Sequence, residues 1–277
     1  IPPSIIMIVY GVAANVSISK LFLAGVIPGL MLAALFMGYI IVWALFNKDK
    51  VPAADAAMSF GQKIHASRHL IPVVSLIALV LGGIYSGIAT ATEAAALGVG
   101  GALLLAKIEG SLNWARFKDG LAAACRIYCM IGLILAGAAF LTLAMGFIGL
   151  PRHLAEFIGG LNLSPFNLML LLIVFFIVLG CFLDGISMVV LTIAVLLPTV
   201  EAAGFDLIWF GIFIVLVVEM AQITPPVGFN LFVIQGLTRR EVTWIARTAL
   251  PLFLLMLVAV LLTYFVPDVV LWLPRQM

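Results

Sequence analysis

Two stretches of the chain carry hydrogen-bonding side chains deep inside long apolar runs. The first contains Asp184, Gly185 and Ser187, and the second runs from Thr224 to Asn230. Carboxylate, hydroxyl, amide and carbonyl oxygens are hard ligands, which suit a hard cation such as sodium. An ionisable group inside an apolar run is costly and indicates a functional site. We therefore expect a cation or substrate site here; the alternative is a water-facing turn that the Asp184 carboxylate caps.

The second stretch interrupts its helix with two prolines. Proline lacks the backbone N–H and leaves carbonyl oxygens free, while glycine allows close backbone approach. A helix that crosses lipid must satisfy its backbone polar groups internally, so such a break survives only where protein encloses it. The alternative is a kinked helix whose backbone groups bond to neighbouring helices. The residues expected to bind sodium or substrate in this stretch are Thr224, Pro225, Pro226, Gly228 and Asn230.

Three more residues are predicted to lie near this site. Ser4, with the carbonyl groups around Ile1, follows a second Pro-Pro break at Pro2-Pro3. Glu219 and Gln222 lie one helical turn apart, directly before the Thr224 break. Both are candidates for lining the cavity. For Glu219, a bond to a neighbouring helix is the alternative.

Composition places the chain in a membrane. Of its 277 residues, 65% are hydrophobic and 9% are charged, whereas soluble domains carry about 25% charged residues. Apolar stretches of about 20 residues indicate helices that span the bilayer and exclude a barrel of alternating strands. The net charge of +2, without a basic stripe, gives no indication of nucleic-acid binding. We expect an all-α polytopic membrane protein.

Apolar runs and charged loops together predict the organisation of the chain. Loops rich in Lys and Arg are expected on the cytoplasmic side, and they cover 48–68, 107–118 and 239–247. The expected parts are a broken helix and span in 1–46, connecting helices and cytoplasmic loops in 47–119, and a second group of helices in 120–277. Within these parts we expect helices over 21–46, 70–86, 92–106, 120–147 and 249–270, a re-entrant hairpin over 166–200 and a broken helix over 207–236. Two full spans at 166–200 would place the charged loops on the same sides of the membrane as a hairpin does. The polar tip at Asp184 is therefore the argument for a hairpin.

Prolines suggest an internal repeat. Pro2 and Pro225 are 225 − 2 = 223 residues apart, and Pro28 and Pro251 are also 251 − 28 = 223 apart. The charged flanks predict that the two copies cross the membrane in opposite directions, which is typical of inverted repeats in secondary transporters. The hairpin that would pair with the first break would precede Ile1, so we expect the chain to be the C-terminal part of a longer protein.

The remaining polar and sulfur-containing residues are expected to be structural. Cys125, Cys129 and Cys181 lie in apolar segments, and we expect them to pack rather than form disulfides. Thr92 is the expected N-cap of the helix that follows, with Glu93 in its first turn. His65 and His69 are four residues apart but lack a third ligand, so no metal site beyond sodium is expected.

Four separated motifs occur in order along the chain. They are Ile1-Pro-Pro-Ser-Ile5 with Tyr10-Gly11, Gly87-Ile-Ala-Thr-Ala-Thr-Glu-Ala-Ala-Ala96, Phe182-Leu-Asp-Gly185 with Leu196-Leu-Pro-Thr199, and Ile223-Thr-Pro-Pro-Val-Gly-Phe-Asn230. Together they resemble the large membrane (permease) subunit of tripartite ATP-independent periplasmic (TRAP) transporters. The resemblance implies an ion-transporter-superfamily elevator fold and symport driven by sodium ions, without an organic cofactor. It also implies a small membrane subunit, a periplasmic substrate-binding protein, an organic-acid substrate such as a C4-dicarboxylate or sialic acid, and a place in the bacterial inner membrane.

Other functions fit the residues less well. An aspartyl intramembrane protease needs a second membrane Asp besides Asp184, and a serine enzyme needs a membrane-buried base. His65, His69 and His153 all lie in expected loops, so we predict that the protein is not an enzyme. A channel would carry polar stripes along its pore, whereas the polar groups here cluster at helix breaks. A stand-alone sodium-coupled carboxylate carrier of the same superfamily remains the alternative.

Overall fold

The long apolar runs of this chain fold into helices, because lipid offers no partner for free backbone amides. The computed structural model describes residues 2–51, 59–149, 153, 156, 160–161, 163–225 and 228–276, and every regular element in this part of the chain is helical. Among the described residues, five helices are long and apolar enough to cross a membrane: α2 (Ile18–Phe46), α5 (Ala91–Ile108), α6 (Trp114–Ile148), α9 (Gly185–Ala202) and α12 (Val242–Phe265). The expected class, an all-α polytopic membrane protein, is confirmed.

The shorter elements complete the described chain. The apolar ones are α1 (Ile5–Ala13), α4 (Ile71–Tyr85), α8 (Pro165–Gly180), α10 (Leu207–Gln222) and α11 (Phe229–Thr238). The others are α3 (Phe60–Ser67), α13 (Asp268–Leu271) and the 3-10 turns η1 (Lys48–Lys50), η2 (Arg68–Leu70) and η3 (Pro274–Gln276). These elements form two units, one of Ile1–Ala33 with Arg126–Met277 and the other of Ala34–Cys125.

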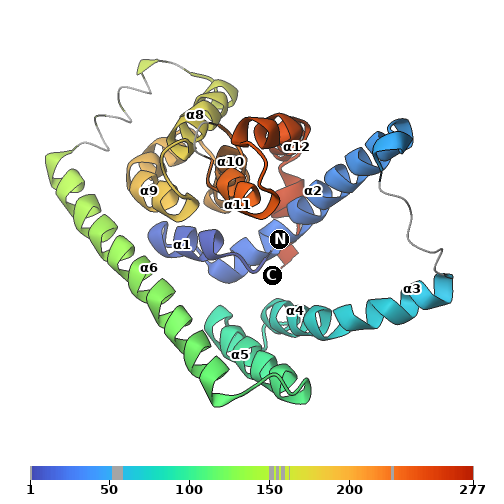
Figure 1. Cartoon of the computed structure of the whole chain (residues 1–277). Coiled ribbons are helices and arrows are strands. Elements are labelled where there is room, and N and C mark those ends of the chain that lie inside the picture. Colours follow the sequence, from blue (N-terminus) through green and yellow to red (C-terminus); the bar gives the residue numbers. More distant parts are fainter. Residues whose placement is uncertain are drawn as a thin grey trace. The chain divides into compact units, whose positions relative to one another are not determined.

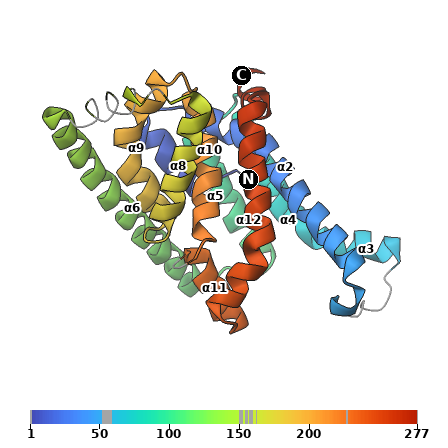
Figure 2. The same ribbon diagram turned by 90° about the horizontal axis from the view of Figure 1, so that it is seen from above.

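In the first unit, α10 is the central helix. It contacts α1, α8, α9 and α12 (Figure 1), and the same neighbours surround it in the view from above (Figure 2). Between Trp209 and Gln222, only Val215 and Glu219 are not fully buried. A helix that is apolar all round is expected to be buried. The contacts of α10 therefore decide which other segments come together.

In the second unit, α4 packs against α5. A Cβ atom placed on Gly101 would lie 2.5 Å from the Leu76 side chain, so the missing side chain lets the two helices approach closely. The segment between 47 and 69, which we expected to be a loop, contains the helix α3. A polar segment can form a helix when its apolar residues gather on one face.

Predicted helix ends agree best where a break or cap fixes them. The range of α10, Leu207–Gln222, matches the first limb of the expected broken helix at both ends. By contrast, α6 begins at Trp114 instead of Gly120, and α12 covers Val242–Phe265 instead of 249–270. Charged side chains can extend from a helix into water, so a helix need not end where its apolar run ends.

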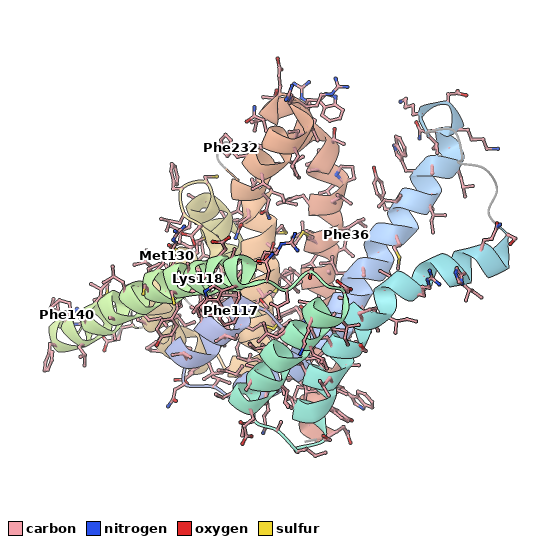
Figure 3. The ribbon with its side chains drawn as sticks, turned by 60° about the horizontal axis from the view of Figure 1, so that its bottom comes forward. Phe36, Phe117, Lys118, Met130, Phe140 and Phe232 are labelled. Carbon is pink, nitrogen blue, oxygen red and sulfur yellow. The ribbon has the colours of Figure 1, made fainter. Side chains whose placement is uncertain are left out.

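The helix α6 is exposed along its length. None of its described residues is buried, and Figure 3 shows the side chains of Met130 and Phe140 extending away from the helix. Cys125 and Cys129 lie on α6 and are both exposed. The prediction that these two cysteines pack inside the chain was therefore wrong, because the apolar surroundings that suggested burial belong to an exposed helix.

The N-cap of α5 is Thr90, not Thr92 as the sequence suggested. The Thr90 hydroxyl accepts a hydrogen bond from the Glu93 amide (3.3 Å), and the Glu93 carboxylate accepts one from the Thr90 amide (2.8 Å). This reciprocal pair is a capping box. The prediction that Glu93 is a structural group at the helix N-terminus is confirmed. The cap is Thr90 and not Thr92 because a capping box places the acidic residue three positions after the N-cap.

We expect Thr90→Ala to loosen the first turn of α5, because it removes the acceptor for the Glu93 amide. Amide hydrogen exchange in this turn should become about fivefold faster, in line with the usual effect of losing an N-cap. Thr92→Ala is the matched control and should leave the exchange rate unchanged. Equal acceleration by both variants would contradict the assignment of Thr90 as the cap.

Two pairs of helices share local structure, as the proline spacing suggested. In each pair a short helix (α1 or α11) precedes a long helix with an internal proline, Pro28 in α2 and Pro251 in α12. The turn between the helices contains a non-glycine residue with positive φ in both cases, Asn15 (54°) and Arg239 (56°). These two residues are 239 − 15 = 224 apart, one more than the proline offset. The similarity therefore extends to the connecting turns.

Candidate functional site

The first candidate stretch is the turn between α8 and α9. Asp184 caps α9, because its Oδ2 accepts hydrogen bonds from the amides of Ile186 (3.1 Å) and Ser187 (3.2 Å). The Ser187 hydroxyl donates to Oδ1 of the same carboxylate. A carboxylate has about four lone-pair sites, and these three bonds leave one for a further ligand. The turn is thus capped by the Asp184 carboxylate, as in the alternative to a binding site. The carboxylate still has a lone pair that can face a cation.

The ends of three helices meet at Gly185. A Cβ atom placed there would lie 2.3 Å from Gln222 Nε2, 2.9 Å from Val218 Cγ1 and 3.2 Å from Ile6 Cδ1. Val218 and Gln222 belong to the last turns of α10, and Ile6 belongs to the first turn of α1. The first turn of α9 therefore lies against the end of α10 and the start of α1, and a larger residue than glycine would separate them.

The second candidate stretch is the break between α10 and α11. The Thr224 hydroxyl donates to the Met220 carbonyl (2.9 Å), and the Gly228 amide donates to the Thr224 carbonyl (3.1 Å). A Cβ atom on Gly228 would lie 2.6 Å from the Gln222 carbonyl oxygen and 2.8 Å from that of Thr224. The chain folds back closely on itself at this point, and Gly228 makes that possible. Pro226, a predicted ligand, lies outside the described residues.

The two stretches touch each other. The Cys181 sulfur lies 3.4 Å from the carbonyl oxygen of Pro225, within reach of a thiol hydrogen bond, and at the same distance from the Ile177 carbonyl oxygen of its own helix. At the residue before Cys181, a Cβ atom on Gly180 would lie 2.3 Å from the Cβ of Ala221, so α8 and α10 are in close contact. No hydrogen bond between described residues joins Asp184 or Ser187 directly to the Thr224–Asn230 break. The contact between the stretches therefore runs through Cys181 and Gly185.

Glu219 and Gln222 lie in the last turns of α10, directly before the second break. Glu219 is partly buried. Gln222 is buried, with 8% of its surface exposed, and its amide nitrogen faces Gly185. Both predicted cavity-lining residues therefore lie beside the break, and the role of Glu219 stays a prediction.

Ser4 stands at the start of α1 as its N-cap residue, with extended backbone angles and no capping bond from its side chain. Ile1 lies outside the described residues. Two residues after Ser4, Ile6 contacts Gly185, as described above. The start of α1 thus lies at the same place as the turn between α8 and α9 and the end of α10.

The sequence comparisons identify the family. A model described as the DctM component of the tripartite ATP-independent periplasmic transporter matches residues 1–269. The chain belongs to this DctM family. The resemblance inferred from the four motifs is therefore confirmed.

Relatives within the DctM family are similar along nearly the whole chain. The C4-dicarboxylate TRAP transporter large permease protein DctM of Pseudomonas aeruginosa is 31% identical over 276 residues, which are 99% of this chain and 64% of that protein. The isethionate TRAP transporter permease protein DctMQ of Oleidesulfovibrio alaskensis is 32% identical over 273 residues, 97% of this chain and 42% of that protein. The ectoine TRAP transporter large permease protein TeaC of Halomonas elongata is 32% identical over 275 residues, 99% of this chain and 64% of that protein. The chain thus spans less than two thirds of the length of these relatives.

Sequence reasoning missed several residues that build the site of this DctM chain. Ile6, Val218 and Ala221 are ordinary apolar residues in helices, and no sequence signal distinguishes them. Cys181 was expected only to pack, yet its thiol lies within hydrogen-bonding reach of the Pro225 carbonyl. Its position next to the polar turn was a signal that could have been used. Among the described residues, no group of three or more His, Cys, Asp or Glu side chains could hold a metal ion.

Proposed function

We propose that this DctM chain belongs to the large permease subunit of a sodium-coupled tripartite transporter that imports a small organic acid. The observation that supports this proposal most directly is the meeting of three helix ends at Gly185, namely the starts of α1 and α9 and the end of α10. Interrupted helices expose free carbonyl and amide groups, and transporters use such groups to bind ions and substrates. In this proposal Asp184, Ser187 and the carbonyls near Thr224 and Pro225 bind sodium, while Asn230 contacts the substrate or the ion.

The proposal includes partners and a mechanism. Substrate is delivered by a soluble periplasmic binding protein, and a small membrane subunit joins the large one in the bacterial inner membrane. Transport proceeds by an elevator movement, in which the hairpin 166–200 and the broken helix 207–236 move with the bound substrate. The solutes named for relatives, C4-dicarboxylates, isethionate and ectoine, each carry a carboxylate or a sulfonate. The free amides at a helix N-terminus attract such anionic groups.

Uptake into proteoliposomes tests the proposed function. The large subunit as encoded by its gene is reconstituted with the small subunit, and uptake of succinate, isethionate, ectoine and sialic acid is measured. An inward sodium gradient and the binding protein are each supplied or omitted, with potassium replacing sodium in the control. Uptake that requires both supports the proposal. Uptake that requires sodium alone would favour a stand-alone carrier, and uptake that is indifferent to sodium would contradict sodium coupling.

We expect Asn230→Ala to lower sodium-dependent uptake by about tenfold or more. The substitution removes the side-chain amide that this proposal places beside the ion or substrate, and the loss of a hydrogen bond to a charged group has a cost of this order. Gln235→Ala removes a similar side chain from the same helix, away from the break, and serves as the matched control. Both proteins should insert into the membrane normally. Normal sodium stimulation in Asn230→Ala would contradict its place in the site.

A further inference from the structure

A cavity lies at the opposite end of α10 from the break. Its volume is about 200 Å³, and its lining includes Phe205, Asp206, Trp209, Tyr264 and Pro267. One water needs only roughly 10–15 Å³ of such space, so this cavity can hold a larger group. Asp206 is the N-cap of α10, and the 16 residues of the helix place the cavity about 24 Å from the break. It is therefore separate from the candidate transport site.

Stacked aromatic rings form one wall of this cavity. The Phe205 and Trp209 rings stack with their centroids 5.1 Å apart and an angle of 12° between their planes. Tyr264 meets Trp209 edge-on at 6.3 Å. The indole N–H of Trp209 donates to the Thr263 carbonyl (2.8 Å), which fixes the ring in place. Phe213 also stacks on Trp209 (5.5 Å, 15°), and Trp209 is buried, so the ring faces that the wall offers to a ligand are those of the partly exposed Phe205 and Tyr264.

The cavity also contains a carboxylate with a free oxygen. Oδ1 of Asp206 accepts hydrogen bonds from the amides of Ile208 (2.8 Å) and Trp209 (3.0 Å). No described residue donates a hydrogen bond to Oδ2 of Asp206. Arg275 forms an ion pair with Asp268 (2.7 Å), the residue after the lining residue Pro267. No ion pair between described residues involves Asp206. The negative charge of Asp206 is therefore available to a ligand.

We propose that this cavity binds the ammonium headgroup of a zwitterionic phospholipid such as phosphatidylethanolamine. Aromatic faces attract organic ammonium groups through cation–π interactions, and the Asp206 carboxylate complements the positive charge. The cavity is formed where α10 begins and α12 ends, at the opposite end of these segments from the Arg239-Arg240 turn between α11 and α12. Trp and Tyr are concentrated at the level of the lipid headgroups. The cavity is therefore expected at the level of the lipid headgroups, where the ammonium group of a phospholipid can enter it.

Lipid binding to the purified protein tests this proposal. Native mass spectrometry measures the binding of phosphatidylethanolamine and of phosphatidylglycerol, which lacks an ammonium group, to the full large subunit in detergent. The wild type should bind phosphatidylethanolamine at least about threefold more tightly, the factor expected for one exposed cation–π contact. Asp206→Asn keeps the helix cap but removes the charge, and Tyr264→Leu removes a ring. Each variant should lose the preference.

Matched variants distinguish the cavity from a general effect on the protein. Tyr264→Phe keeps the ring, and Glu201→Gln removes an exposed charge outside the cavity lining, so both should keep the preference. Equal binding of the two lipids by the wild type, or an unchanged preference in Asp206→Asn and Tyr264→Leu, would overturn the proposal. Soluble phosphoethanolamine is the remaining arm of the test. If it binds as tightly as the lipid, the ligand is a soluble amine and the assignment to a phospholipid is wrong.

Discussion

Asp184→Asn is expected to lower sodium-stimulated uptake by about tenfold or more while leaving α9 correctly capped. Asparagine caps helices as well as aspartate does, so the amides of Ile186 and Ser187 keep an acceptor. The charge that would attract sodium is lost, and interactions with a charged group are worth enough to account for this factor. Asp184→Ala removes both the cap and the charge and should abolish sodium-dependent uptake.

Comparison of these two variants separates the two roles of Asp184. If the carboxylate serves only as a cap, Asp184→Asn will transport as the wild type does, and only Asp184→Ala will be impaired. Uptake should be measured over a range of sodium concentrations, because loss of a sodium ligand raises the concentration needed for half-maximal uptake. Membrane insertion of both variants is checked by the amount of protein in the membrane fraction. An unchanged sodium dependence in both variants would rule out sodium binding by Asp184.

Gly228→Ala is expected to abolish transport by distorting the break between α10 and α11. The added Cβ would lie 2.6 Å and 2.8 Å from two backbone carbonyl oxygens, those of Gln222 and Thr224. Backbone atoms cannot turn aside as a flexible side chain can, so the break itself must open. Overpacking of this kind costs ~1–3 kcal/mol. We expect at least a tenfold loss of uptake and a lower thermal midpoint of unfolding in detergent.

Gly236→Ala is the matched control for this prediction. Gly236 lies in the same helix, α11, and a Cβ atom there would meet nothing within 4 Å. Alanine is preferred to glycine within helices, so this variant should transport normally and unfold at the same or a slightly higher temperature. Normal uptake by Gly228→Ala would show that the close approach of the backbone at Gly228 is not needed for transport.

Much of the fold could be predicted because a membrane helix has strong local signals. The limits of α10 were predicted correctly, since an acidic N-cap precedes it and a proline break follows it. The helix starts at Trp114 and Val242 were missed, because charged residues near a span can belong either to a loop or to an extended helix. Thr90 and Thr92 are both good N-cap residues, and only the hydrogen bonds of the Glu93 capping box distinguish between them.

The candidate site was predicted residue by residue but not as an arrangement. Asp184, Gly185 and Gly228 stood out because polar and flexible residues are rare inside apolar runs. The contact of the Gln222 amide with Gly185 was not predicted, although both residues were named. Each had several possible partners, and sequence periodicity places residues on a helix face without saying which face meets which.

The sequence by itself determined that this chain is helical, that it is built for a membrane, and where two of its helices are interrupted. These properties follow from local chemistry, because apolar side chains, proline and glycine act on the backbone nearest to them. Only the tertiary structure decided that Gly185 lies against Gln222 and Ile6 and that Cys181 lies against Pro225. Such contacts join segments that are far apart in the chain, and they depend on how closely whole helices can pack. A missing side chain at Gly180 or Gly185 permits that approach, but the partner that fills the space is set by the fold.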